Sequence, residues 1–275
     1  MAQKEPEAKE STENSQNFTA GFKYEDLELT VSEMLKAGVH FGHKSSRWNP
    51  KMKPYIFGIK NGIHIVDLDK TLAMFQKALE YIEQIVANGG KILFVGTKPQ
   101  ARDVIRWAGE KTEMPYVSNR WLGGTFTNFN EIKKRIRYLN GQEEKMISGE
   151  FDKYTKYEQG KIRKEIEKMN EKMGGIKKME SLPQLIFAVD IKEDGLAVKE
   201  ARRMKIPVVA MSDTNNDPTL ADYAIPANDD ALSSLKYILG IVMKKIKEAK
   251  SKAKPTPNNK PKKPEIKNKA HDHEK

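Results

Sequence analysis

The sequence contains no cysteine. Disulfide frameworks, thiolate zinc sites and cysteine nucleophiles are therefore excluded, and this composition is typical of a reducing compartment. No apolar run approaches the roughly 18 residues of a membrane-spanning helix, and the acidic start of the chain lacks the apolar segment of a secretory signal. We therefore expect a soluble, cytoplasmic protein that is not exported and does not contact membranes.

The common phosphate-binding and hydrolase motifs are also missing. Gly96-Thr97-Lys98 follows an apolar run, but the chain has no GxxxxGKS or GxxxxGKT loop, no GxGxxG and no GxSxG. We therefore expect no catalytic residues and no organic cofactor. A cytoplasmic nucleotide- or phosphosugar-binding α/β enzyme that uses the Gly96 loop is the alternative.

Acidic residues are absent from one basic part of the chain. The 275 residues carry a formal net charge of +11, divided as +2 over residues 1–130, +5 over 131–178, −4 over 179–243 and +8 over 244–275. Because the end of the chain supplies most of the excess, the total charge is a weak indication of nucleic acid. A stronger one is that residues 34–66 hold no acidic side chain.

Residues 34–66 combine cations with aromatic rings. Lys and Arg neutralise phosphates, hydroxyl and amide groups reach the ribose 2′-OH, and aromatic planes stack on unpaired bases. We therefore expect the loop at 42–55 to contact RNA, a solvated surface loop being the alternative. Trp48 is a candidate for stacking on a base, although packing in the core is the favoured interpretation for this ring. The cations that we assign to RNA here are Lys44, Arg47, Lys51, Lys53 and Lys60.

Short apolar runs alternate with helical patterns over much of the chain. Such runs, bounded by turn residues, are typical of strands buried in a parallel sheet, so the pattern predicts a parallel α/β fold. Before them, Thr30 and Glu33 predict a capped helix, and Asn61-Gly62 between two apolar runs predicts a β-hairpin. The runs lie at residues 92–95, 115–117, 185–189 and 206–211.

Residues 128–178 interrupt this alternation and predict an insertion. Apolar residues recur there at helical spacing along two stripes, separated by a polar turn region. We expect two antiparallel helices packed as a protruding coiled-coil hairpin, the alternative being two ordinary helices that lie on the sheet. The stripes are Ile132, Ile136 and Leu139, and Ile162, Ile166, Met169 and Met173.

Both ends of the chain have little to bury. Their polar, lysine-rich and proline-rich composition predicts a disordered extension at residues 1–28 and a disordered basic tail at 250–275. The α/β domain then comprises residues 29–127 and 179–249.

A second candidate RNA-binding loop, at residues 118–129, opens the insertion. Its paired glycines, Gly123 and Gly124, let a backbone approach closely, and the N–H groups at the start of a helix bind phosphate. We therefore expect a phosphate cradle here, continued by cations along the following helix. The residues that we assign to RNA are Arg120, Thr125, Thr127, Asn128, Lys133, Lys134, Arg135 and Arg137.

Two aspartates and three histidines raise the question of a metal. Asp190 and Asp213 each follow a predicted strand, so both carboxylates should emerge at the carboxyl edge of the sheet, where doubly wound enzymes place Mg²⁺ or substrate. Capping of the following turns is the favoured interpretation, with a divalent metal as the alternative. For His40, His43 and His64 we expect structural or RNA-contacting roles, because no carboxylate or cysteine nearby in the sequence completes a recognisable ligand set.

Seven stretches between about Leu29 and Lys247 occur in the order of one protein family. They are LKAGVHFGHKSSRWNPKMKPYIFG, NGIHIVDLDKT, KILFVGTK, NRWLGGTFTNF, MGGIKKMESLPQLIFAVD, IPVVAMSDTNNDP and YAIPANDDA. On these stretches the chain resembles the bacterial S-two family of small-subunit ribosomal proteins. Phe126 departs from the family, which commonly has a smaller aliphatic residue there.

The resemblance implies a flavodoxin-like or Rossmann-like domain with a coiled-coil insertion. It implies a structural role without catalysis, on the ribosome in the cytoplasm, with small-subunit ribosomal RNA between head and body as the partner and no DNA. It also implies contacts with neighbouring ribosomal proteins and help in docking the large S-one ribosomal protein. A free-standing RNA chaperone is a further alternative, which predicts that removing residues 250–275 abolishes association with RNA.

Overall fold

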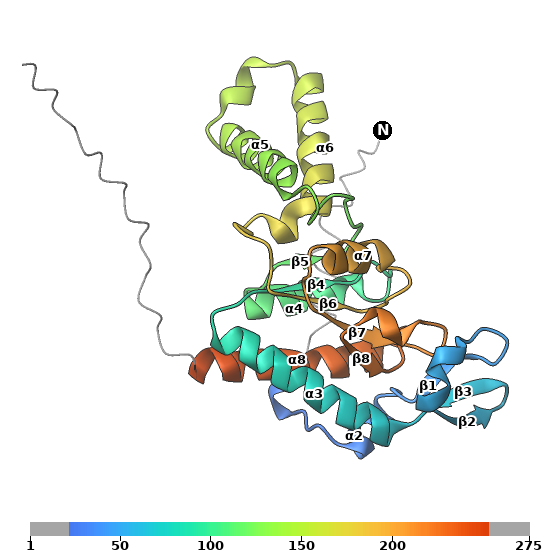
Figure 1. Ribbon diagram of the computed structural model, residues 1–275. Helices are drawn as coiled ribbons and strands as arrows, with labels where there is room; N and C mark the ends of the chain where they lie inside the picture. Colours follow the sequence, from blue (N-terminus) through green and yellow to red (C-terminus); the bar gives the residue numbers. More distant parts are fainter. Residues whose placement is uncertain (1–21, 253–275) are drawn as a thin grey trace, which may run out of the picture.

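A parallel five-stranded sheet forms the centre of the computed structural model, which describes residues 22–252 (Figure 1). The strand order is β5-β4-β6-β7-β8, so the chain runs outward from β4 to β5 and then returns past β4 to β6. This order, with helices on both faces, is that of a doubly wound Rossmann-like fold, as expected. The strands are β4 (Ile92–Val95), β5 (Tyr116–Val117), β6 (Leu185–Ala188), β7 (Val208–Ser212) and β8 (Tyr223–Pro226).

Alternate residues of each strand contribute to two hydrophobic clusters, one on each face of the sheet. In β4, Phe94 packs on one face and Val95 on the other. The first face is covered by α3 (Leu68–Ala87), α4 (Arg102–Thr112) and α8 (Leu232–Lys252). The second face is covered by α7 (Gly195–Arg203) and by the base of the inserted segment.

A second, antiparallel sheet contains β1 (Phe41–Lys44), β2 (Ile56–Lys60) and β3 (Ile63–Val66) in the order β1-β3-β2. The predicted hairpin is confirmed, because Asn61 and Gly62 have φ values of 53° and 75°, as the mirror-image turn between twisted strands requires. The predicted helix before it is also present as α2 (Val31–Lys36), and the Thr30 hydroxyl accepts a hydrogen bond from the Glu33 N–H.

The inserted segment contains α5 (Phe129–Ile147) and α6 (Lys156–Met173), which project from one end of the sheet (Figure 1). Ile132, Ile136 and Leu139 are buried on α5, and Ile166 and Met173 are buried on α6. Glu143 joins the two helices, because its carboxylate accepts hydrogen bonds from Asn170 and from Lys177. Single 3₁₀ turns lie at Tyr24–Asp26, Pro50–Tyr55, Glu150–Lys153, Gly174–Ile176 and Pro218–Leu220.

The expected ends of the α/β domain are wrong by several residues. Residues 22–28 are not a solvated extension, because Tyr24 is buried with its ring 5.5 Å from that of Trp107. α8 continues past the expected boundary at 249, and Lys250 donates a hydrogen bond to the carbonyl of Thr112. The rest of the two expected tails, residues 1–21 and 253–275, lies outside the described residues.

Candidate nucleic-acid interface and the adjoining acidic cluster

The basic loop at 44–55 is fixed against the loop that follows β7. Thr214 makes both connections: its hydroxyl accepts a hydrogen bond from the His43 N–H (2.9 Å), and its carbonyl accepts one from the Asn49 N–H (2.8 Å). This approach requires glycine at position 42, since a Cβ there would lie 2.5 Å from the Thr214 Cγ2 and 3.0 Å from the His64 carbonyl. The small sheet thus presents the loop from a fixed position.

Most of the predicted cations of this loop are free to contact a ligand. The side chains of Lys44, Arg47, Lys53 and Lys60 are exposed, and none of them forms a hydrogen bond or ion pair within residues 22–252. Lys51 is different, because its ammonium lies 2.6 Å from an Asp217 carboxylate oxygen and 3.2 Å from the Thr219 hydroxyl. We therefore expect Lys51 to be the weakest phosphate ligand of the set.

The favoured interpretation of Trp48 as a core residue is wrong. The side chain is 38% exposed, and its ring contacts that of His64 at 5.4 Å between centroids. The Trp48 ring is therefore on the surface, where it can stack on a base. The sequence could not distinguish packing in the core from stacking on a base, because a tryptophan ring suits both roles.

The backbone N–H groups of the second loop do not form the expected phosphate cradle. A protein carboxylate already occupies it: Glu200, from α7, accepts hydrogen bonds from the N–H groups of Gly124 (2.8 Å), Phe126 (3.0 Å) and Thr127 (3.2 Å). The Trp121 indole N–H donates to the same carboxylate. Burial raises the pKa of Glu200, but these hydrogen bonds outweigh it and leave the pKa below its ordinary value.

Thr125 also departs from the expectation, because its buried hydroxyl donates to the Leu122 carbonyl at 2.6 Å. It is therefore not available to RNA. The Thr127 hydroxyl is 3.3 Å from Glu200 and is exposed, as are Arg120 and Asn128. The surface of this loop is thus formed by Arg120, Thr127 and Asn128.

The cations of α5 divide into two pairs. Lys133 donates to the Glu180 carbonyl at 2.7 Å, and Lys134 pairs with Glu131 at 2.6 Å. Arg135 and Arg137 are exposed and have no partner in the described part of the chain. These two arginines are therefore the better phosphate ligands on the helix.

Asp190 and Asp213 both lie at the carboxyl edge of the sheet, as predicted, but they have different partners. Asp190 caps the following turn, accepting from the Lys192 N–H at 2.7 Å, which confirms the capping interpretation for this residue. Its other oxygen lies 2.8 Å from the Lys98 ammonium, which also contacts Asp229 (2.7 Å) and Asp230 (2.9 Å).

Two residues of this ion cluster, Lys98 and Asp229, have shifted pKa values. Burial lowers the pKa of Lys98, but the carboxylates outweigh it and raise the pKa above its ordinary value. Burial, together with the negative charges of Asp190 and Asp213, raises the pKa of Asp229 well above the usual range. At the carboxyl edge of the sheet, the ammonium of Lys98 thus neutralises part of the negative charge of the aspartates.

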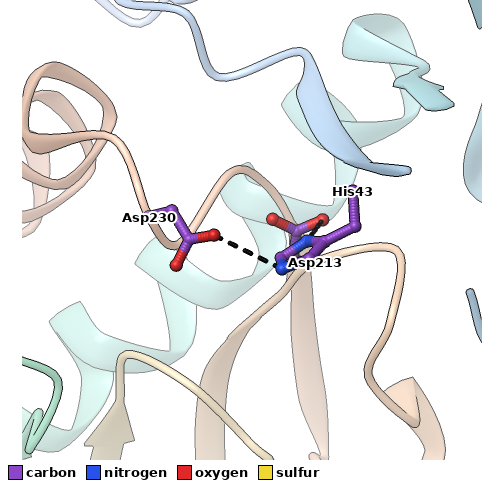
Figure 2. A group of neighbouring side chains, drawn as sticks. All are labelled: His43, Asp213 and Asp230. Carbon is purple, nitrogen blue, oxygen red and sulfur yellow. Dashed lines mark ion pairs between the residues drawn. The ribbon is translucent and has the colours of Figure 1, made fainter. Parts of the chain in front are cut away.

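Asp213 also caps the turn that follows it, because its carboxylate accepts hydrogen bonds from the N–H and the hydroxyl of Thr214, and it faces His43, as Figure 2 shows. The Nδ1 atom of His43 lies 3.1 Å from Asp213, and its Nε2 atom lies 3.3 Å from Asp230. The hydrogen bond to Asp213 raises the pKa of His43 despite partial burial. These three residues place one potential ligand atom each within 4.8 Å of one another, whereas His40 and His64 are not part of the group.

The sequence interpretation missed Lys98, Glu200, Asp229 and Asp230. The position of Glu200 could have been noticed in the sequence, because it is an acidic residue on the same helical face as the apolar Ala197 and Ala201. This pattern indicates a buried carboxylate with partners inside the protein. The two aspartates follow β8, a short strand that the apolar runs did not reveal.

No helix within residues 22–252 is long and apolar enough to span a membrane. In the comparison with protein families, the family model described as Ribosomal protein S2 matches residues 34–249. The chain belongs to this family. The resemblance inferred from the seven sequence stretches is therefore confirmed.

Known members of the family are similar over most of their length. The chain is 52% identical over 210 residues to the small ribosomal subunit protein uS2 of Roseiflexus castenholzii, covering 76% of this chain and 80% of the relative. It is 51% identical over 221 residues to that of Chlorobaculum tepidum (80% and 89%) and 47% identical over 224 residues to that of Desulfatibacillum aliphaticivorans (82% and 76%). The family match includes both basic loops, the inserted segment and the acidic cluster.

Proposed function

We propose that this chain is a structural component of the small ribosomal subunit in the cytoplasm and that it binds small-subunit ribosomal RNA. Membership of the S2 family and the names of its relatives support the ribosomal role. The observation that carries RNA binding is the set of exposed cations on the two loops and on β2 whose side chains have no partner within residues 22–252. These are Lys44, Arg47, Lys53, Lys60 and Arg120.

The inserted segment extends this surface in our proposal. α5 and α6 act as a helical hairpin that packs on its own apolar stripes and presents Arg135 and Arg137 to RNA. The burial of Ile132 and Ile166 in one hydrophobic cluster supports this packing. The hydrogen bond between Glu143 and Asn170 supports an antiparallel pairing of the two helices.

Docking of the S-one ribosomal protein is included in the proposal on the strength of the family resemblance alone. Its test is a pull-down of small subunits that carry or lack this chain, with S-one retention as the readout. Retention of S-one on subunits lacking the chain would contradict this part of the proposal.

RNA binding is tested by the salt dependence of affinity. Replacing Lys44, Arg47, Lys53 and Arg120 together by Ala should reduce the slope of log K against log salt by about 3 to 4, because each lost phosphate contact contributes about 0.7–0.9. A matched control replaces the four exposed cations Lys23, Lys77, Lys91 and Lys111, which lie away from the two loops. An unchanged slope in the first variant would contradict the proposed RNA surface.

A divalent cation bound by His43, Asp213 and Asp230 is a second proposal. An imidazole together with two carboxylates is a donor set that suits zinc, and the three side chains already converge. Titration calorimetry with Zn²⁺ should detect a site that Asp213→Asn removes. Equal Zn²⁺ binding by the variant would contradict it.

A further inference from the structure

The two sides of α7 have different surroundings. Ala197, Val198 and Ala201 are buried in the cluster that the sheet shares with the inserted segment. Lys199, Arg202 and Arg203 are exposed. None of these three side chains forms a hydrogen bond or ion pair with the residues that the structure describes.

The cationic surface of α7 cannot be seen in the net charge of residues 179–243, which is negative. Residues 179–243 hold six basic and ten acidic side chains, so the sequence indicates an acidic region. However, Asp190, Asp194, Glu200, Asp213 and Asp229 are all buried. Because these carboxylates are buried, the exposed cations around α7 outnumber the exposed acidic residues Glu193 and Asp222, and the net exposed charge there is positive.

Glu200 connects this surface to the second RNA-binding loop. Its carboxylate leaves the inner side of α7 and binds the N–H groups of the loop from Gly124 to Thr127. Next to it, the Leu196 side chain of α7 lies close to Gly123, 3.9 Å from where a Cβ on that glycine would be. The cations of α7 and Arg120 are therefore carried by two segments held together.

The far end of α7 continues the positive surface. Lys205 follows the helix with a φ of 57° and, with Arg202, lines a shallow hollow of about 280 Å³ beside Pro207 and Asp222. The Asp222 carboxylate accepts a hydrogen bond from the Val208 N–H at 2.8 Å, so it is engaged within the protein. Lys199, Arg202, Arg203 and Lys205 thus lie within about two helical turns.

We propose that the exposed side of α7 is a further RNA-binding surface, on which Lys199, Arg202 and Arg203 contact phosphates of the strand that also contacts Arg120. The proposal rests on the proposed function. A nucleic-acid backbone fits better than an acidic protein, because exposed cations on two connected segments can neutralise several phosphates of one strand.

The test compares two charge-matched variants of the full chain in binding small-subunit RNA. Lys199→Gln, Arg202→Gln and Arg203→Gln together should reduce the slope of log K against log salt by about 2 to 3. The control, Lys77→Gln, Lys91→Gln and Lys111→Gln, makes the same change in net charge on exposed positions elsewhere and should leave the slope nearly unchanged. Circular dichroism checks that both variants fold.

A third variant separates charge from side-chain shape. Lys199→Arg, Arg202→Lys and Arg203→Lys together preserve every charge and should retain the slope of the wild-type protein. If the glutamine variant retained the wild-type slope while the Ala variant of Lys44, Arg47, Lys53 and Arg120 lost it, the α7 surface would be wrong and the proposed function would stand. If neither variant changed the slope, the proposed function itself would be wrong.

An acidic protein partner gives a different result. In that case the glutamine variant would bind RNA with the wild-type slope but would fail to remain with native subunits during sedimentation. That outcome would overturn the assignment of α7 to RNA.

Discussion

Glu200 accepts a hydrogen bond from the indole N–H of Trp121 at 3.2 Å, although the two residues are 79 positions apart in the chain. The same carboxylate binds three backbone N–H groups of the loop that leads into α5. One acidic side chain thus sets the direction in which the inserted segment leaves the sheet.

Glu200→Ala should destabilise the protein by about 3 kcal/mol, because it leaves buried N–H donors without an acceptor. Glu200→Gln should cost less, since one oxygen remains. Urea denaturation measures both. The wild-type protein should have a higher free energy of unfolding than the Gln variant, and this difference should be fully present above the pKa of Glu200 in the unfolded state. It should decrease as the pH falls through the lower pKa of Glu200 in the folded state, because protonation then removes the charge in both states. A difference independent of pH would contradict this role.

Asp194 should show the opposite pH dependence. Burial raises its pKa to about 6, above an ordinary value of 3.8. The wild-type protein therefore loses stability as the pH rises through this interval, because the unfolded carboxyl ionises more readily than the folded one. Asp194→Asn cannot ionise, so relative to wild type it should be more stable at pH 7 than at pH 4, as followed by urea denaturation. An equal difference at both pH values would show that the folded carboxyl has an ordinary pKa.

Lys51 and Arg47 should differ in their contribution to RNA binding. Both are exposed, but Lys51 must leave Asp217 to reach a phosphate. Arg47→Gln should therefore reduce the salt slope by about 0.7–0.9 and Lys51→Gln by less. Filter binding over a range of salt concentrations measures both, and equal reductions would show that the ion pair does not compete with RNA.

Ile166→Asp tests the packing of α6. The residue is 4% exposed, so the substitution buries an unpaired charge and should destabilise the inserted segment by about 3 kcal/mol or more while the sheet remains folded. Limited proteolysis should then cut within residues 128–178 faster than in wild type. The exposed neighbour Glu167 provides the control, as Glu167→Asp should not change the cutting rate.

Truncation after Lys252 tests the basic tail. The structure moves the cut from the expected position 250, because Lys250 still contacts α4. Residues 253–275 hold seven basic and three acidic side chains without aromatic residues. Their loss should weaken binding to all RNA sequences alike and leave incorporation into subunits intact. A truncated chain that failed to enter subunits would contradict this expectation, and complete loss of RNA binding would favour the RNA chaperone alternative.

Local patterns predicted the secondary structure well where strands are fully apolar or turns are specific. β4, β6 and β7 and the Asn61-Gly62 hairpin follow directly from such patterns. β8 was missed because its four residues begin with tyrosine and end in proline, so they do not form a continuous apolar run like those of β4 and β6. The domain boundary near residue 22 was missed because a few apolar side chains, the buried Tyr24 and the partly buried Phe22 and Leu27, pack a segment of otherwise polar composition against the core.

The candidate site was predicted less completely, because exposure and pairing depend on residues distant in the chain. The sequence identifies Lys51 and Lys53 as equivalent cations, yet Asp217 is close only to Lys51. The paired glycines of the second loop indicate a backbone that binds an anion, which is correct. The anion is the carboxylate of Glu200, which lies more than 70 residues further along the chain.

The position of α8 determines the order in which a newly made chain can fold. This last helix packs against α3 and α4 and contacts the first described segment, where Lys244 donates to the carbonyl of Leu27. One face of the sheet is therefore covered only in part, by α3 and α4, until residues 232–252 have been synthesised. During translation, the other face of the sheet and the small sheet can assemble first. The apolar side chains of α3 and α4 that pack on α8 stay exposed until this helix has left the exit tunnel.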